Sequence, residues 1–520
     1  MKFIKIIFVF FTCIILTSSF DYQSFTKNEP EIDEWLPPTP EILELRERLD
    51  EILGSYDSLE YDFGLRIISL DEKRIFYEHQ IDKPLLPASN QKIITTAAAM
   101  SLLGSDFKWQ TEFFTDAEDN LHIKPNGDPT LFKLPEINHF FRCVADSLIS
   151  KGISQIKGKV LIDPKGYNDS DIGAGWKEEN RYYSYSAKPS VIAFYENSVQ
   201  FKITPGAIGK KPSISVYPVD AGFEIVNKMN TISQNRQGIT FDMSHDENQI
   251  TFYGNVWHRS KPHYRTLATQ KPDIYALEVV KKKLTENGIS IIGDVLYAKN
   301  LKIETKKLFQ IDSDKFIDVL NEINKKSNNF MANQLFLTIG NEYAAPYTTE
   351  HLIKYWLSEN GIVADSLRMF DGSGLSTLNA CTVNILSEVL KLMYDTPYFT
   401  DFHNSMSISG REGTLKNSLS NRNLYNKVYA KTGFIIGARA LSGYIETLDN
   451  EMLAFSLIIN KEGSHIGNFY AICEKILLQL ALFEKEKLAV TQTTAGDGSE
   501  NEFTPFDIDF IDEVEQDFYE

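Results

Sequence analysis

The sequence is short of cysteine and of long apolar runs. Of its four cysteines, Cys13 lies inside an N-terminal apolar run, which leaves Cys143, Cys381 and Cys473. Three cysteines with no CxxC or Cys/His spacing do not make a disulfide framework or a metal site, so we expect free thiols and no metal. At most one bridge could form. The apolar run covers residues 6–16, well short of the roughly 20 residues that a membrane-spanning helix needs.

This apolar run is typical of an export signal. Lys2 and Lys5 precede it and Thr17-Ser18-Ser19 follows it, which predicts a signal peptide over residues 1–19 and secretion to the periplasm or cell envelope. An uncleaved N-terminal segment is the alternative. Membrane association is then at most peripheral or through this segment.

Positive charge is absent from the C-terminal end. No Lys or Arg follows Lys487, whereas ten acidic residues do, and they hold more than half of the formal net charge of −18. Gly, Ser and Thr lead into this stretch, so we expect residues 488–520 to be a disordered acidic tail. The chain has no basic patch, and its acidic balance argues against nucleic acid as a partner.

Between these ends the chain has the composition of a globular protein, with 42% hydrophobic and 24% charged residues. The pattern of expected helices and strands changes twice along this part of the chain. Residues 20–40 read as a linker, 41–107 as the first part of an α/β domain, 108–303 as a β-rich insertion, and 304–487 as the second part of the same domain.

The α/β parts have a regular order of expected elements. The helices are expected at 41–53, 93–103, 320–337, 349–361, 383–394 and 466–482, and the strands at 63–70, 74–79, 426–433, 439–446 and 451–460. This order predicts a five-stranded antiparallel sheet, one face of which is covered by the first and last helices. In the insertion, helices are expected only at 137–151 and 274–287.

Three short motifs follow one another in the chain: Ser89-Asn90-Gln91-Lys92, Ser327-Asn328-Asn329 and Lys431-Thr432-Gly433. They match the S-x-x-K, S-D-N and K-T-G set of penicillin-binding proteins and serine β-lactamases. S-x-x-K occurs four times, but only Ser89 lies after a proline at the start of an apolar helix. Each motif alone could be an ordinary helix cap or strand end. The three in this order, each in a suitable element, favour a catalytic site.

The chemistry expected of the motifs is serine acylation. Lys92 lies one helical turn after Ser89 on the same face, and burial lowers the pKa of a lysine, so a neutral Lys92 could take the serine proton. Lys431 is the second cation beside it. The hydroxyl of Ser327 could relay a proton between Lys92 and the leaving amine, and Asn329 could form a hydrogen bond with the substrate amide.

The strand motif supplies the expected substrate-binding residues. A local twist could let Lys431 and Thr432 both reach a substrate carboxylate, and Gly433, having no side chain, would let an acyl group come close to the backbone. Phe434 stands where the usual K-T-G-T pattern has a second hydroxyl.

Further segments resemble the penicillin-binding protein 4 type of D-Ala-D-Ala carboxypeptidase/endopeptidase, serine peptidase family S13. The family's PASNxK motif is matched by residues 87–92, GDPTL by 127–131, DGSGLS by 371–376 and GTL by 413–415. A weaker W…A…N pattern of the inserted domain is matched by Trp176, Ala187 and Asn197. Ser89 and Ser327 are 238 residues apart, and this family places whole domains between its first two motifs. The resemblance covers about Glu41 to Leu482.

The resemblance implies a β-lactamase/transpeptidase-like domain that acts on peptidoglycan stem peptides, is inhibited by β-lactams and needs no cofactor. It implies an oxyanion hole made by the backbone N–H groups of Ser89 and Phe434. A backbone donor survives at Phe434, but a carboxylate-binding hydroxyl does not, which weakens the expected carboxypeptidase activity. Two alternatives stay open from the sequence: a β-lactamase or esterase on the same fold, and a non-catalytic wall-binding protein.

Overall fold

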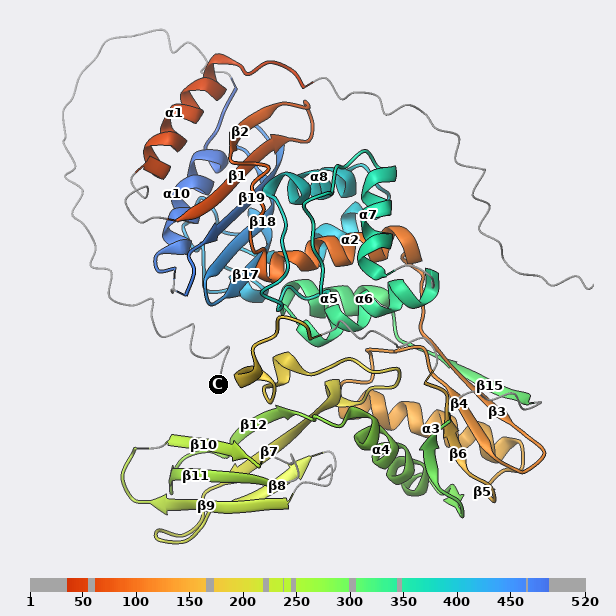
Figure 1. Cartoon of the computed structure of the whole chain (residues 1–520). Helices are drawn as coiled ribbons and strands as arrows, with labels where there is room; N and C mark the ends of the chain where they lie inside the picture. The colour runs from red at the N-terminus through yellow and green to blue at the C-terminus, as the bar shows by residue number, and fades with distance from the viewer. Residues whose placement is uncertain are drawn as a thin grey trace, which may run out of the picture.

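The computed structural model describes residues 35–485, except 55–60, 165–172, 218–223, 237, 245–248, 299–304, 344–347 and 464–465. The predicted signal peptide, most of the predicted linker and the acidic tail lie outside the described residues. Two bodies are evident in Figure 1: an α/β body above, built from both ends of the described chain, and a β-rich body below, built from its middle.

The α/β body is organised around one antiparallel sheet. Its strand order is β16-β17-β18-β19-β1-β2. The strands are β1 (Asp62–Ser69), β2 (Ile75–His79), β16 (Ser407–Ile408), β17 (Val428–Ile435), β18 (Ala438–Glu446) and β19 (Met452–Asn460). Five strands were predicted. The sixth, β16, has two residues, too few for a periodic pattern to show.

Helices cover both faces of this sheet, which is why β1, β18 and β19 are buried along nearly their whole length. In β18, Leu441 and Ile445 pack on the side of α1 (Pro40–Gly54) and α10 (Phe469–Ala481), as the period of two requires. Ala440 and Tyr444 belong to the other core. That core contains α2 (Gln91–Leu103), α5 (Phe316–Lys325), α6 (Asn329–Tyr343), α7 (Thr349–Glu359), α8 (Val383–Tyr394) and α9 (Phe399–Asn404).

The inserted body has its own core and several small sheets. Their strand orders are β14-β6-β4-β3-β15, β10-β11-β9, β12-β7-β8 and β13-β5. The helices are α3 (Leu134–Ser150) and α4 (Pro272–Glu286). The strands are β3 (Gln110–Thr115), β4 (Leu121–Lys124), β5 (Gln155–Ile156), β6 (Val160–Ile162), β7 (Ser198–Thr204), β8 (Ser213–Tyr217), β9 (Glu224–Ile232), β10 (Gly238–Met243), β11 (Gln249–Trp257), β12 (His263–Ala268), β13 (Ser290–Ile291), β14 (Val295–Tyr297) and β15 (Lys306–Asp312).

Two boundaries differ from the sequence predictions. Strand β15 was placed in the second part of the α/β domain, beginning at 304, but it pairs with β3 of the insertion. The inserted body therefore extends to about Asp312. The single helix expected over 320–337 is two helices, α5 and α6, because Ser327 between them has a left-handed φ of 58°.

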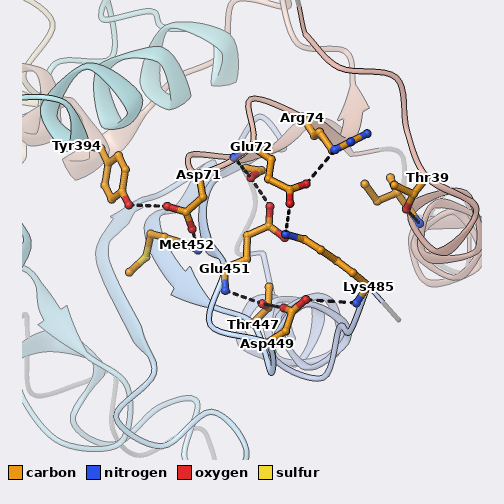
Figure 2. Close-up of polar contacts among 12 residues, drawn as sticks. Thr39, Asp71, Glu72, Arg74, Tyr394, Thr447, Asp449, Glu451, Met452 and Lys485 are labelled. Carbon is orange, nitrogen blue, oxygen red and sulfur yellow. Dashed lines mark hydrogen bonds and ion pairs between the residues drawn. The ribbon is translucent and has the colours of Figure 1, made fainter. Parts of the chain in front are cut away.

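A polar network connects the segment that directly follows α10 to the β1–β2 turn (Figure 2). Lys485 forms ion pairs with Glu72 (2.5 Å) and with Glu451 (3.0 Å). Glu451 is 3% exposed and also accepts a hydrogen bond from Ser69. Lys485 thus compensates a buried carboxylate just before the start of β19, a group that is costly to bury without a partner.

Candidate active site

The candidate nucleophile lies in a tight turn that feeds the most buried helix of the α/β body. Residues Ala88–Asn90 form a 3-10 turn after Pro87, and α2 follows directly. Ala88 has a φ of 45°, an uncommon conformation for a residue with a side chain, and such strain is concentrated at functional sites. The turn leaves Ser89 half-buried at the surface of a cleft.

Lys92, one turn along α2, is fully buried and points at Ser89. Its Nζ lies 2.8 Å from Ser89 Oγ, 2.7 Å from Asn329 Oδ1 and 2.7 Å from the carbonyl oxygen of Ser373. Two of these partners are carbonyl oxygens, which can only accept hydrogen bonds. Ser89 is therefore the one partner that could donate a proton to a neutral Lys92.

The carbonyl of Ser373 is presented by a loop folded around Asp371. The carboxylate of Asp371, which is completely buried, accepts hydrogen bonds from the backbone N–H groups of Ser373 (3.1 Å), Gly374 (2.7 Å) and Ser376 (2.8 Å). A Cβ on Gly374 would lie 1.8 Å from the carbonyl oxygen of Ala88. Glycine is thus required for the loop to pack against the nucleophile turn.

The second lysine reaches the site from β17. Lys431 is fully buried, and its Nζ donates to Ser327 Oγ (2.9 Å) and to the carbonyl oxygen of Thr432 (2.8 Å). Ser327 is thus bonded to Lys431 in this structure, and Asn329 to Lys92. The prediction linked Ser327 to Lys92 through a proton relay, because spacing alone cannot assign two residues of one motif to separate partners.

The two lysines are held in an environment that disfavours charge. Burial lowers the pKa of Lys92 to about 7, against a smaller raising effect of Asp371. Burial and the neighbouring Lys92 lower the pKa of Lys431 as well. A lysine with a pKa near 7 can be neutral at the start of a reaction and protonated in the middle of it.

A cleft with a volume of about 510 Å³ opens over these residues. Both bodies line it: Ser89, Ser327, Asn329, Thr414, Thr432 and Phe434 from the α/β body, and Tyr185 and Glu196 from the inserted body. The hydroxyls of Thr432 and Thr414 lie 2.8 Å apart at its wall. The cleft can therefore hold a peptide with its carbonyl over Ser89 and polar ends on either side.

Gly433 has a structural role that the sequence did not suggest. A Cβ at this position would lie 3.0 Å from the carbonyl oxygen of Pro87 and 3.0 Å from Cβ of Ala440. Because Gly433 has no side chain, the turn that carries Ser89 can approach β17. The sequence prediction had assigned the space beside Gly433 to the acyl group. Asn90 reinforces this contact, since its amide nitrogen, in the orientation that pairs both ends of the amide, donates to the carbonyl oxygen of Lys431 (2.8 Å).

Phe434 lies on the cleft side of β17 and is half-buried. The guanidinium carbon of Arg439, its cross-strand neighbour, is 3.9 Å from the centre of the phenyl ring. Arg439 lines the cleft too. The position that would carry a hydroxyl in K-T-G-T thus carries an aromatic ring under a cation.

Several residues of the site were missed at the sequence level. Asp371, Thr414 and Trp176 were noted as parts of resembling segments, but no role followed from their spacing. Trp176 donates from Nε1 to Asp371 (2.7 Å), which ties the inserted body to the loop that holds Lys92. Nothing in the sequence pointed to Glu196 except that it directly precedes Asn197. Among the described residues, no group of three or more His, Cys, Asp or Glu side chains is placed to hold a metal ion.

The family described as D-Ala-D-Ala carboxypeptidase 3 (S13) matches residues 45–472. The chain belongs to the S13 family. This confirms the resemblance inferred from the motifs, and with it the prediction of a hydrolase that is a penicillin-binding serine D-Ala-D-Ala carboxypeptidase.

Relatives and solved structures agree with S13 membership. A D-alanyl-D-alanine carboxypeptidase of Actinomadura sp. (strain R39) is 26% identical over 443 residues, 81% of each chain. The crystal structure of penicillin binding protein 4 (dacB) from Haemophilus influenzae superposes with a TM-score of 0.70 at 22% identity, covering 85% of this chain and 99% of that one. Its complex with a β-lactam superposes with a TM-score of 0.65 at 21% identity, covering 86% and 100%.

The fold class is confirmed by these similarities: an antiparallel sheet flanked by helices, interrupted by a large β-rich insertion, as in the S13 fold. In the described part of the chain, none of the helices is both long and apolar enough to cross a bilayer.

Proposed function

We propose that this S13 peptidase cleaves D-Ala-D-Ala stem peptides of peptidoglycan through an acyl-enzyme on Ser89, and that β-lactams inhibit it by acylating the same oxygen. The observation that carries the proposal is the set of contacts of Lys92. Its two carbonyl partners leave Ser89 Oγ as the one group that can pass a proton to the neutral amine.

The acylation step follows from this geometry. The hydroxyl proton of Ser89 moves to Nζ of Lys92 as Oγ attacks the carbonyl carbon of the penultimate D-Ala. The tetrahedral intermediate collapses, the C–N bond breaks, and the leaving amine takes up one proton. Lys92 is neutral again, and a water molecule, deprotonated in the same way, hydrolyses the ester and releases Ser89.

The other motif residues would divide the remaining work. Ser327, oriented by its bond to Lys431 and exposed to the cleft, would relay the proton of Lys92 to the leaving amine. The side chain of Asn329 would hold Lys92 in place, and the backbone of Asn329 would lie beside the substrate peptide. The hydroxyl of Thr432 would bind the substrate carboxylate, and Lys431 would attract it when protonated. The backbone N–H groups of Ser89 and Phe434 would form the oxyanion hole, with Gly433 beside the acyl group.

The cell envelope is the compartment where this substrate lies. A signal peptide over residues 1–19 would deliver the chain to the periplasm, and an uncleaved N-terminal segment would instead keep it at the membrane surface. Edman sequencing of the mature protein, or its intact mass, distinguishes these two arrangements.

Digestion of purified peptidoglycan tests the proposal. The wild-type protein should release D-Ala from pentapeptide stems or cleave D-Ala-linked dimers, both visible as product masses, and Ser89→Ala should do neither. Matched activity of wild type and Ser89→Ala would refute the acyl-enzyme. The ratio of dimers lost to free D-Ala released measures how the protein divides between endopeptidase and carboxypeptidase activity.

A further inference from the structure

A carboxylate of the inserted body reaches into the catalytic cleft on an unusual backbone. Tyr195, Glu196 and Asn197 all have left-handed φ values, of 53°, 56° and 50°. Three such residues in succession cost free energy and persist only where surrounding contacts fix them. Here the side-chain amide of Asn197, which is fully buried, donates to the carbonyl oxygen of Lys188 (2.8 Å) and to Ser190 Oγ (2.9 Å).

The partner of Glu196 is the middle residue of the Ser327-Asn328-Asn329 motif. Asn328 Nδ2 donates to Glu196 Oε1 at 2.6 Å. Asn328 Oδ1 accepts from the backbone N–H of Met331 (2.9 Å) and so caps helix α6. Both ends of the Asn328 amide are therefore bonded: its nitrogen to the inserted body and its oxygen to helix α6.

The inserted body also holds the last residue of the motif. Asn329 Nδ2 donates to the carbonyl oxygen of Tyr185 (3.0 Å), while Asn329 Oδ1 accepts from Lys92. Ser327, the first residue, has its own left-handed φ of 58°. Asn328 and Asn329 are thus both bonded to the inserted body, directly after a residue in an uncommon backbone conformation.

We propose that Glu196 is a positioning residue for the S-x-N motif, and that its carboxylate is the reason why this chain has Ser-Asn-Asn where the general pattern has Ser-Asp-Asn. An aspartate at 328 could still cap α6, but it would place a second carboxylate against Glu196. Two carboxylates at this distance cannot both be ionised and must share a proton. The inference rests on the proposed roles of Ser327 and Asn329.

The charged groups around Glu196 do not remove this constraint. Burial raises the pKa of Glu196, Asn328 and the cations Lys133 and Lys326 oppose that rise, and Glu322 adds to it. Lys326 is exposed and bonded to Glu322. The surroundings therefore already carry two carboxylates facing two lysines, and an aspartate at 328 would add a third.

A swap of the pair tests the inference. The variants are Asn328→Asp, Glu196→Gln and the double variant, with Glu178→Gln, an exposed glutamate on the same inserted segment, as the matched control. The rate constant of acylation by a fluorescent penicillin is measured from about pH 5 to pH 9, together with the melting temperature.

At neutral pH, Asn328→Asp alone should acylate at least about tenfold more slowly than wild type, the scale of a lost charge-assisted hydrogen bond, and the ratio of the two rates should approach one as the pH falls. The double variant restores one amide and one carboxylate in reverse order, and its rate should return to within about threefold of wild type. The control should match wild type.

Two results would overturn the inference. One is an Asn328→Asp variant that acylates at the wild-type rate across the pH range. The other is a double variant no faster than Asn328→Asp alone while its melting temperature equals that of wild type. If Asn328→Asp fails to fold, Glu196→Ala replaces it: a slower acylation at an unchanged melting temperature supports the inference, and an unchanged rate refutes it. None of these results depends on which residue is acylated, which Ser89→Ala tests separately.

Discussion

Nζ of Lys92 lies 2.8 Å from Oγ of Ser89, and both atoms belong to a single turn of chain held from two sides. On one side the loop of Asp371 presents the carbonyl of Ser373. On the other side β17 packs against Pro87 through Gly433. Ser89 and Lys92 are close in sequence, but their orientation depends on segments almost 300 and 350 residues further along the chain.

The two lysines should act as one unit. We expect Lys92→Ala and Lys431→Ala each to slow acylation by at least ~10²-fold, the usual scale for a lost acid/base or electrostatic group. The effects should not multiply in the double variant, because each lysine works through the other's charge and partners. Stopped-flow acylation by a chromogenic β-lactam measures this, with the exposed Lys281→Ala as the control. Simple multiplication would show that the lysines act independently.

The acylation rate should depend on pH through Lys92. Since its pKa is lowered to about 7 by burial, the fraction of neutral amine grows as the pH rises through 7. Only the neutral amine accepts the serine proton, so the rate should rise over the same range and then level off. A rate that stays flat from about pH 5.5 to 8.5 would exclude Lys92 as the base.

Phe434 should set the preference between substrates. Phe434→Thr supplies a carboxylate-binding hydroxyl, whose charge-assisted bond contributes about 1.5–3 kcal/mol, so turnover of D-Ala-D-Ala pentapeptide should rise relative to cross-linked dimer. Phe434→Leu, which lacks both the hydroxyl and the ring, is the matched control and should leave the ratio near its wild-type value.

Stability of the Phe434 variants separates specificity from packing. Phe434→Thr and Phe434→Leu both lose the ring beneath Arg439, a cation–π contact worth about 0.5–2 kcal/mol. The two variants should therefore have melting temperatures similar to each other. A full core cavity would cost ~3–5 kcal/mol, but Phe434 is only half-buried. A large drop in melting temperature with an unchanged product ratio would mean that Phe434 merely fills space.

Lys485 should stabilise the fold in a defined pH window (Figure 2). The bond from Lys485 lowers the pKa of Glu72, so this contribution exists above the carboxyl's ordinary pKa of 4.5 and is lost as the pH falls. Although partial burial opposes it, the bonds to Glu72 and Glu451 raise the pKa of Lys485, so the contribution exists below 10.5 and is lost as the pH rises.

The variant Lys485→Met would leave Glu451, whose pKa burial already raises, without its cation. We expect it to lower the free energy of unfolding by about 1–3 kcal/mol near pH 7, and by less near pH 4, where the carboxyls become protonated. Urea unfolding at the two pH values measures this, with Lys281→Met as the control. Equal losses at both pH values would show that the side chain contributes by packing alone.

The sequence predicted well what is encoded within a few residues. The turn and helix from Pro87 to Leu103, the hairpin of β1 and β2, and the strands β17 to β19 each carry their own apolar period and turn residues. The i, i+3 spacing placed Lys92 against Ser89 because both lie within one turn. The order of the three motifs indicated the chemistry, and the further matching segments with the 238-residue spacing from Ser89 to Ser327 then identified the family.

What the sequence could not show depends on contacts between distant segments. Strand β15 lies at the edge of the inserted sheet because it pairs with β3, nearly 200 residues earlier. The pairing of Lys431 with Ser327 and of Lys92 with Asn329 depends on the left-handed φ of Ser327. Glu196 reaches the cleft only through the left-handed residues 195–197, for which the sequence carries no pattern such as glycine.

The most direct test of the acyl-enzyme is to locate the bound β-lactam. The wild-type protein and Ser89→Ala are incubated with penicillin, digested and mapped by tandem mass spectrometry. The account predicts one penicilloyl adduct in the wild-type protein, on the peptide that contains Ser89, and no adduct in Ser89→Ala. An adduct on the peptide of Ser105 or Ser154, which begin two of the other S-x-x-K matches, or an undiminished adduct in Ser89→Ala, would contradict it.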